Sequence, residues 1–424
     1  KGVNVPYVKV NLPGITEQDK KDILFGIEQK FDFIAASFVR SAEVIREIRK
    51  LLNDNGGQDI GIIAKIENAE GVENIDSIIE ASDGIMVARG DLGVEIPASQ
   101  VPHIQKEIIR KCNDHYTPVI TATQMLDSMM KHPRPTRAEA TDVANAVYDG
   151  TSAIMLSGET AAGDYPVEAL QTMVKIASRT EQDINYMSRL KKRGILTNPD
   201  ITNAIAHATC TTAMDLNASA IITVSNSGRT ARMVSKYRPA CPIIGCSVNE
   251  DVCRKLNMSW GVTPLLVELK HNSDELFDHA VDKAEEMGLI EQGEIVVLTA
   301  GVPLGISGTT NMIKVHVAGH ILMQGKGLTD KSAAANLCVI SSPEELKEKF
   351  KEGDIIVARD TSNEMMEQIR LASGLIIEND SADCHGAIAG LSLDLPVLIG
   401  AENATQILKF SGNLCNADRR FPHD

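Results

Sequence analysis

The chain has 424 residues, of which 42 are Lys or Arg and 57 are Asp or Glu, and its formal net charge is −15. Such an acidic chain is not expected to bind nucleic acid or anionic membranes, because both partners require cationic surfaces. No apolar run approaches the roughly 20 residues of a transmembrane helix. The eight cysteines include no C-x-x-C pair, which argues against a disulfide scaffold and against a zinc site. We therefore expect a cytoplasmic protein of about three α/β domains.

Short apolar runs alternate with amphipathic stretches along the chain. Two helices are expected at residues 42–52 and 100–115. Continuously apolar strands that alternate with helices indicate a parallel sheet that is buried on both faces. A closed barrel of this kind needs eight strands. The first part of the chain offers five, at residues 32–38, 61–66, 84–88, 118–122 and 153–156.

Two interruptions in this alternation of strands and helices divide the chain. A linker is expected around residues 186–200, and a second junction near residues 319–332. The middle block has strand candidates at residues 220–224, 242–246, 262–267, 294–299 and 312–317. The last block has them at residues 337–340, 354–358, 374–377 and 396–399. These breaks predict domains at residues 1–185, 186–328 and 329–424.

Charged residues end the second and third strands. Lys65 and Glu67 are two positions apart, so their side chains share one face of the strand. Asp91 follows the next strand and is expected at the same edge of the sheet, where α/β barrels place their active sites. Two carboxylates with a nearby Lys suit Mg²⁺ and a phosphorylated substrate. A Lys–Glu ion pair with Asp91 as a turn residue is the alternative.

The pattern recurs on the next strands. Ala88-Arg89-Gly90 can offer backbone N–H groups to a substrate carboxylate, and Thr121-Ala122-Thr123-Gln124-Met125 and Leu156-Ser157-Gly158-Glu159-Thr160 also end strands in polar residues. Between these two segments lies a cationic loop, Lys131-His132-Pro133-Arg134-Pro135-Thr136-Arg137-Ala138-Glu139. The loop either binds an anion or forms a subunit interface.

Residues 1 to about 330 closely resemble pyruvate kinase. The resemblance rests on several long motifs in order: Ile62-Ile63-Ala64-Lys65-Ile66-Glu67-Asn68, Val87-Ala88-Arg89-Gly90-Asp91-Leu92-Gly93, Thr121-Ala122-Thr123-Gln124-Met125-Leu126, Arg134-Pro135-Thr136-Arg137-Ala138-Glu139, Asp142-Val143-Ala144-Asn145-Ala146-Val147 and Leu156-Ser157-Gly158-Glu159-Thr160-Ala161. It implies an α/β protein with the C-terminal part of a (β/α)₈ TIM barrel and an α/β regulatory domain. It also implies a cytoplasmic homotetramer that transfers the phosphoryl group of phosphoenolpyruvate to ADP in glycolysis, giving pyruvate and ATP.

The resemblance also assigns roles to individual residues. Lys65 would stabilise the transition state of phosphoryl transfer, and Glu67 and Asp91 would hold Mg²⁺ or Mn²⁺. Thr123 would lie near the enolate carbon that is protonated. Substrate contacts would come from Ala88, Arg89, Gly90, Asp91 and Thr123.

The family's first three barrel strands and most of its lid domain have no counterpart in these 424 residues. By resemblance, the missing part carries the K⁺ ligands and several ATP and ADP contacts. We therefore expect a fragment whose catalytic activity depends on the missing part. A regulatory module that binds an effector without turnover is the alternative.

A loop in the middle block, at residues 223–230, also resembles a loop of the family. Between a strand and a helix, hydroxyls and backbone N–H groups can cradle a phosphate. The stretch resembles the family's loop for a phosphorylated allosteric effector, and an ordinary capped helix is the alternative. The loop at residues 301–311 resembles the one that closes over a sugar phosphate. The expected effector contacts are Thr223, Ser225, Asn226, Ser227, Gly228, Arg229 and Thr230.

The last block resembles the extra domain of some bacterial pyruvate kinases, which is similar to the small, swivelling phosphohistidine domain of phosphoenolpyruvate-utilising enzymes. Asp383-Cys384-His385 stands where that family has Thr-Ser-His. The additional carboxylate would repel a phosphate on His385. A structural or regulatory role is therefore favoured over a phosphocarrier, and a dikinase-like reaction through His385 is disfavoured.

Overall fold

The computed structural model describes residues 13–193, 200–270, 272–301, 310–319, 323–329, 331, 333–408 and 415–417. Contacts divide the chain into two compact units, of which the first comprises residues 1–290 and 294–316 and the second residues 291–293 and 317–424. The boundary between the first two predicted domains lies inside the first unit. That three-domain division therefore remains a prediction.

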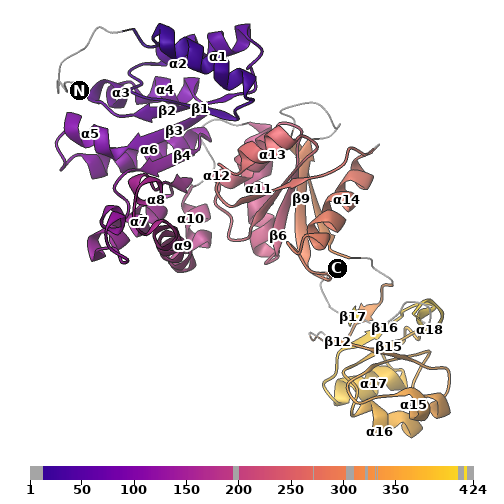
Figure 1. Cartoon of the computed structure of the whole chain (residues 1–424). Helices are drawn as coiled ribbons and strands as arrows, with labels where there is room; N and C mark the ends of the chain where they lie inside the picture. Colours follow the sequence, from indigo (N-terminus) through magenta and orange to yellow (C-terminus); the bar gives the residue numbers. More distant parts are fainter. Residues whose placement is uncertain are drawn as a thin grey trace. The chain divides into compact units, whose positions relative to one another are not determined.

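Five parallel strands form the first sheet, in the order β1-β2-β3-β4-β5 (Figure 1). They are β1 Phe33–Ala36, β2 Gly61–Ile66, β3 Gly84–Ala88, β4 Val119–Ala122 and β5 Ala153–Ile154. All five predicted strands are confirmed. The connecting helices are α1 Glu17–Glu28, α2 Ala42–Asp54, α3 Ala69–Glu73, α4 Ile75–Ala81, α5 Arg89–Glu95, α6 Val101–His115, α7 Arg137–Asp149, α8 Gly158–Ala161 and α9 Pro166–Asp183, with a 3₁₀ turn at Asp127–Met130.

Local sequence explains where these helices begin and which face they bury. Thr16 and Asp19 form a capping box at α1, and Thr136 and Glu139 form another at α7. Helix α2 buries the side chains of Ala42, Ile45, Ile48 and Leu52. These positions recur at intervals of three to four residues, so they form the stripe that packs on the sheet.

A second five-stranded sheet in the same unit has the order β10-β9-β6-β7-β8. Its strands are β6 Ala220–Val224, β7 Ile243–Ser247, β8 Val262–Leu266, β9 Ile295–Gly301 and β10 Thr310–Val317. Strand β6 pairs in parallel with both β7 and β9. Helices α11 Ile201–Asp215 and α14 Ser273–Glu286 lie on either side of β9 in Figure 1. Helices α12 Arg229–Lys236 and α13 Glu250–Leu256 follow β6 and β7.

The linker expected at residues 186–200 is wrong in its first part. Helix α10 Tyr186–Arg193 occupies it, with Leu190 buried at 3% exposure. The Tyr186 ring lies 5.5 Å from that of Trp260, and Arg189 donates to the carbonyl of Tyr148. These contacts hold a helix that is too polar to show an apolar stripe in sequence.

The second unit contains the sheet β11-β16-β15-β14-β13. Strands β13 Leu337–Val339, β14 Ile355–Ala358, β15 Gly374–Ile377 and β16 Val397–Ile399 are parallel and match the prediction. Strand β11 Lys326–Gly327 joins antiparallel to β16, so the junction expected at residues 319–332 includes part of this sheet. The remaining elements are α15 Pro343–Lys349, a 3₁₀ turn at Asn363–Met365, α16 Met366–Ile369, α17 His385–Ser392, α18 Ala404–Ile407, and the antiparallel pair β12 Ala333–Ala335 and β17 Cys415–Ala417.

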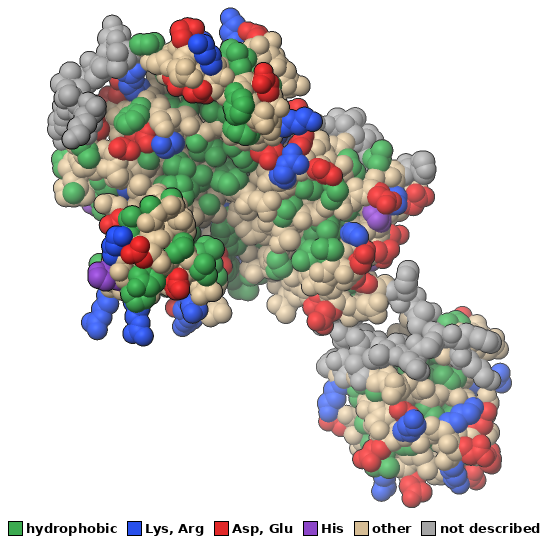
Figure 2. All heavy atoms as spheres, viewed as in Figure 1, with side chains coloured by type: hydrophobic (Ala, Val, Ile, Leu, Met, Phe, Trp, Pro, Cys, Tyr) green, Lys and Arg blue, Asp and Glu red, His purple; other side chains and the backbone are tan. Residues whose placement is uncertain are grey.

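Acidic and basic side chains are interspersed over the visible face of both units (Figure 2). Across the residues described, no helix combines the length and the apolar character that crossing a bilayer requires.

Candidate functional site

Lys65 and Glu67 lie at the carboxyl end of β2, in the first sheet. Ile66 on β2 is paired with Val87 on β3, so Glu67 is level with the end of β3. The Lys65 ammonium lies 2.8 Å from Oε1 of Glu67, and the Glu67 side chain is only 1% exposed while that of Lys65 is 24% exposed. The pair thus combines a buried carboxylate with a cation that reaches solvent.

The end of β1 orients this pair. Lys65 Nζ donates to Ser37 Oγ at 2.7 Å, and the Phe38 backbone N–H donates to Glu67 Oε2 at 2.5 Å. Phe38 has φ +53°, a left-handed conformation that a bulky residue rarely adopts. Sequence reasoning missed Ser37 and Phe38. The signal that could have found them is that they follow β1 as Glu67 follows β2.

Asp91 lies in the first turn of α5, directly after β3, and is exposed. It makes no hydrogen bond or ion pair with the residues described. Among the residues that the structure describes, there is no group of three or more His, Cys, Asp or Glu side chains that could hold a metal. The candidate donor set is therefore two carboxylates, Glu67 and Asp91. That set suits Mg²⁺, which is usually held by one or two carboxylates together with water and substrate oxygens.

Thr123 follows β4 at the same edge of the sheet. It has φ +69°, and the next residue, Gln124, has φ +54°. The Gly90 N–H donates to Thr123 Oγ1 at 2.9 Å, and that hydroxyl donates to the Ala122 carbonyl at 2.6 Å. The Gly90 N–H expected for a substrate carboxylate is thus already bonded within the protein, and substrate would have to replace Thr123 as its acceptor.

The Arg89 side chain does not face solvent, as the side chain of a substrate ligand would. Its guanidinium donates to the carbonyls of Ala122, at 3.1 Å, and Thr123, at 2.6 Å. It also lies 2.7 Å from a carboxylate oxygen of Asp142, and its side chain is 11% exposed. The side chain therefore clamps the left-handed turn that carries Thr123. Ala88, its neighbour, is buried at the end of β3.

Glu159 also has a structural role at this edge. Its side chain is 2% exposed, and its carboxylate accepts from the backbone N–H groups of Leu126, at 3.1 Å, and Ser157, at 2.8 Å. The bonds tie the loop after β4 to the loop after β5.

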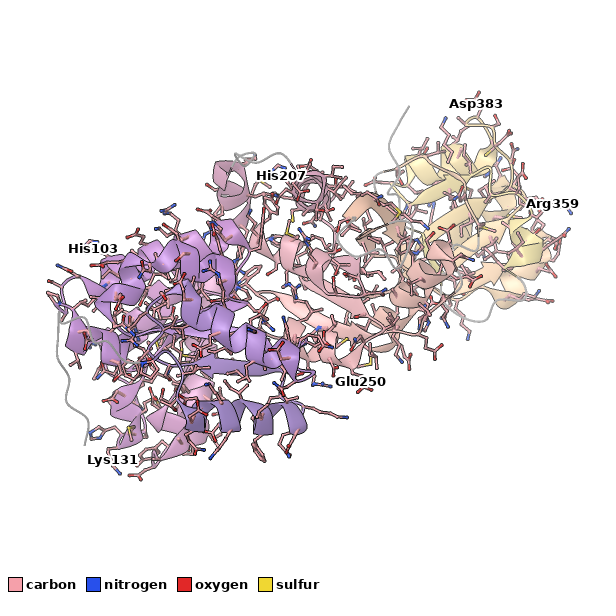
Figure 3. All side chains as sticks on the ribbon, turned by 90° about the horizontal axis from the view of Figure 1, so that it is seen from above. His103, Lys131, His207, Glu250, Arg359 and Asp383 are labelled. Atoms are coloured by element: carbon pink, nitrogen blue, oxygen red, sulfur yellow. The ribbon has the colours of Figure 1, made fainter. Side chains whose placement is uncertain are left out.

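The cationic loop at residues 131–139, by contrast, exposes Lys131, which is labelled in Figure 3. Its other exposed basic side chains are His132, Arg134 and Arg137.

The expected effector loop joins β6 to α12, and Gly228 enters the helix with φ +68°. Asn226 and Arg229 are exposed, and Ser225 and Ser227 are half-buried. Two of the predicted effector contacts, Thr223 and Thr230, use their hydroxyls for hydrogen bonds within the protein. The Thr223 hydroxyl is fully buried and donates to the Ile244 carbonyl, and Thr230 is bonded to Thr310 Oγ1 at 2.7 Å. The second loop, residues 301–311, lies mostly outside the described residues.

His385 begins α17 in the second unit. Its Nδ1 lies 2.7 Å from Thr361 Oγ1, and its Nε2 lies 3.0 Å from Asn363 Oδ1. The Asp360 carboxylate accepts from the Gly386 N–H at 3.2 Å, so an internal anion already occupies the first turn of this helix. Arg359 and Asp383, labelled in Figure 3, lie on the outside of this unit.

Comparison with known proteins shows which family this chain belongs to. A model of the pyruvate kinase barrel domain matches residues 1–170, one of the pyruvate kinase alpha/beta domain matches residues 203–316, and one of the mobile domain of PEP-utilising enzymes matches residues 350–414. A pyruvate kinase of Bacillus licheniformis is 53% identical over 409 residues, which are 96% of this chain and 70% of that protein. The chain belongs to the pyruvate kinase family.

Two further relatives agree. The pyruvate kinase of Geobacillus stearothermophilus is 54% identical over 96% of this chain and 70% of that protein. That of Clostridium acetobutylicum is 58% identical over 75% of this chain and 67% of that protein. Membership of the pyruvate kinase family confirms the phosphotransferase class, the mixed α/β fold and the extra C-terminal domain. It does not favour the alternative of an effector-binding module without turnover.

Proposed function

We propose that the edge formed by the carboxyl ends of β1–β4 transfers the phosphoryl group of phosphoenolpyruvate to ADP. The observation that carries this proposal is the Lys65–Glu67 pair, in which a carboxylate that is 1% exposed holds an ammonium group 2.8 Å away at the open edge of a parallel sheet. A cation held in this way is ready to stabilise the negative charge on a phosphoryl group in transit, and it needs no reorganisation when the reaction begins.

Glu67 and Asp91 would hold Mg²⁺, or Mn²⁺, at this edge. Mg²⁺, when bound, supplies positive charge to the substrate's phosphoryl and carboxylate oxygens. The Phe38 N–H fixes one Glu67 oxygen, so the carboxylate is oriented before any ligand arrives. Asp91 is exposed and without a protein partner among the described residues, which leaves both its oxygens available as ligands.

Thr123 would lie against the substrate carbon that gains a proton, and its hydroxyl is held in place from two sides. Gly90 donates to it, and it donates to the Ala122 carbonyl. Arg89 acts as a positioning residue, because it bonds the carbonyls of Ala122 and Thr123 and so stabilises the left-handed backbone there.

Pyruvate formation from phosphoenolpyruvate and ADP, with Mg²⁺ and K⁺, tests this assignment. Lys65→Met is expected to lower kcat by about three orders of magnitude, which corresponds to about 4 kcal/mol of lost transition-state stabilisation. Lys50→Met changes an exposed lysine of α2 that forms no hydrogen bond or ion pair with the described residues, so it is the matched control and should keep the parent activity. Equal loss in both variants would contradict the role of Lys65.

The loop between β6 and α12 would hold the phosphate of an allosteric effector. Its support is the exposed Arg229 beside the half-buried Ser225 and Ser227, at the start of an eight-residue helix. Thr223 and Thr230 would contribute through the backbone conformation, because their hydroxyls are bonded within the protein. Calorimetric titration with sugar phosphates should show binding that Arg229→Ala abolishes. Unchanged affinity in the variant would refute the assignment.

The family also suggests dependence on K⁺, a homotetramer and a place in the cytoplasm. These remain predictions. Sedimentation velocity of the chain tests the tetramer directly, and a monomer at micromolar concentration would contradict it.

A further inference from the structure

The loop after β1, residues 37–40, holds a strained backbone conformation without help from its own aromatic ring. Phe38 has φ +53°, yet its side chain is 55% exposed, so packing of the ring does not account for the conformation. Strained backbone persists only where the surrounding structure fixes it. The contacts that fix this loop also determine where the Phe38 N–H points, and that group donates to Glu67 Oε2 at 2.5 Å.

One of these contacts comes from α3, the helix that follows Glu67. Gly71 of α3 is buried, and a Cβ at this position would lie 2.6 Å from the Val39 carbonyl oxygen. Only glycine therefore lets α3 approach the backbone of the loop so closely. Val39 itself is 0% exposed and belongs to the hydrophobic core of the first sheet. The residue directly after Phe38 is thus confined between that core and α3.

Asn74 holds the next residue of the loop. Its side-chain amide donates to the Arg40 carbonyl at 2.9 Å. The Asn74 backbone is itself fixed, because its N–H donates to the Glu70 carbonyl at 3.0 Å and its carbonyl accepts from the Ile78 N–H at 3.1 Å. Helix α3 ends and α4 begins around this residue, and its side chain makes no capping bond to α4. The amide is therefore a fixed donor that is directed at the loop after β1.

We propose that Asn74 and Gly71 are positioning residues for the metal ligand Glu67. They hold the loop after β1 so that the Phe38 N–H fixes Oε2 of the carboxylate, while Lys65 lies 2.8 Å from Oε1. Each carboxylate oxygen can accept more than one partner, so Glu67 oriented in this way keeps the capacity to bind a divalent cation. Groups that orient a metal ligand control the affinity for the metal. The inference rests on the proposed role of Glu67 as a ligand of Mg²⁺ or Mn²⁺.

Binding of Mn²⁺ tests the inference without requiring turnover, because the EPR signal of the free ion falls when the ion binds. Asn74→Ala removes the amide, and Asn74→Leu removes it while nearly keeping the volume of the side chain. Both variants should bind Mn²⁺ about tenfold more weakly than the parent, the lower end of the effect of removing a group that orients a metal ligand. Gly71→Ala should also weaken binding, because the added Cβ would displace the Val39 carbonyl.

The matched control is Asn55→Ala. The Asn55 amide also donates to a backbone carbonyl, that of Leu51 at 2.8 Å, but it does so at the end of α2. This variant should keep the parent affinity. A merely structural role of Asn74 would reduce the number of Mn²⁺ sites, because unfolded molecules would lose them, and would leave the affinity of the remaining sites unchanged. Circular dichroism establishes which variants are folded.

Glu67→Gln separates this inference from the proposed function on which it rests. Binding equal to that of the parent in Glu67→Gln, or no saturable binding in the parent, would overturn the metal site and the inference together. Loss of binding in Glu67→Gln with unchanged affinity in both folded Asn74 variants would overturn the positioning role alone. An equal loss of affinity in Asn55→Ala would overturn that role as well.

Discussion

Replacing Arg89 by Met should cost far more stability than replacing an exposed arginine. Arg89 bonds the carbonyls of Ala122 and Thr123 and pairs with Asp142, and its side chain is 11% exposed. Removing one partner of a buried pair costs about 3–5 kcal/mol, mostly because the remaining group is left uncompensated. Asp142 is 35% exposed and can recover part of its hydration. We therefore expect a loss of about 3 kcal/mol in the free energy of unfolding.

The control is Arg110→Met on α6. Arg110 pairs with Asp114 at 3.3 Å, four residues along the helix, but its side chain is 66% exposed. An exposed pair of this kind contributes about 0.3–0.5 kcal/mol. Urea unfolding followed by Trp260 fluorescence, which reports on the first unit, measures both variants. Equal losses would refute the view that Arg89 is a buried clamp.

Arg89→Met should also lower kcat, even at temperatures where the variant is folded. Thr123 and Gln124 both have positive φ, and without the guanidinium the backbone can relax to a more ordinary conformation. The Thr123 hydroxyl would then leave its position. A stability loss with an unchanged kcat would show that the clamp supports folding alone.

Three further results are expected. Glu159→Gln should destabilise the chain by about 2 kcal/mol in urea unfolding, because one of the two backbone N–H groups that bond the carboxylate would face an amide NH₂ instead; a neutral outcome would contradict the role of this buried carboxylate. Burial acts to raise the pKa of Glu139, but hydrogen bonds from Ser128 and Thr136 outweigh it and lower that pKa below 4.5. The folded state therefore gains stability from ionised Glu139 above about pH 4.5, and loses it as pH falls through the lower folded-state pKa. Unfolding free energies measured from pH 6 to pH 3 should accordingly fall more steeply for the parent than for Glu139→Gln, and parallel curves would refute this. Finally, incubation with phosphoenolpyruvate should leave no phosphate on His385, because both ring nitrogens are hydrogen-bonded and Asp360 occupies the helix start; a phosphohistidine signal that His385→Asn abolishes would show the opposite.

Much of the architecture was readable in the sequence. Strands β6 and β15 have the predicted bounds, Ala220–Val224 and Gly374–Ile377, because continuous apolar runs between turn residues describe strands buried on both faces. Lys65, Glu67, Asp91 and Thr123 were predicted at one edge from their positions after successive strands. Parallel topology alone brings such residues together.

Tertiary structure decided what those residues do. Glu67 accepts from Phe38, 29 positions away, and Arg89 donates to Asp142, 53 positions away. No local pattern encodes such pairings, because they arise only when separate strand ends meet. The same reason explains why Arg89 is a clamp and why the polar segment at Tyr186–Arg193 is a helix. Residue types and their spacing thus determined the sheet and the polar edge at its strand ends, whereas long-range packing determined which side chains at that edge are bonded within the protein and which are exposed.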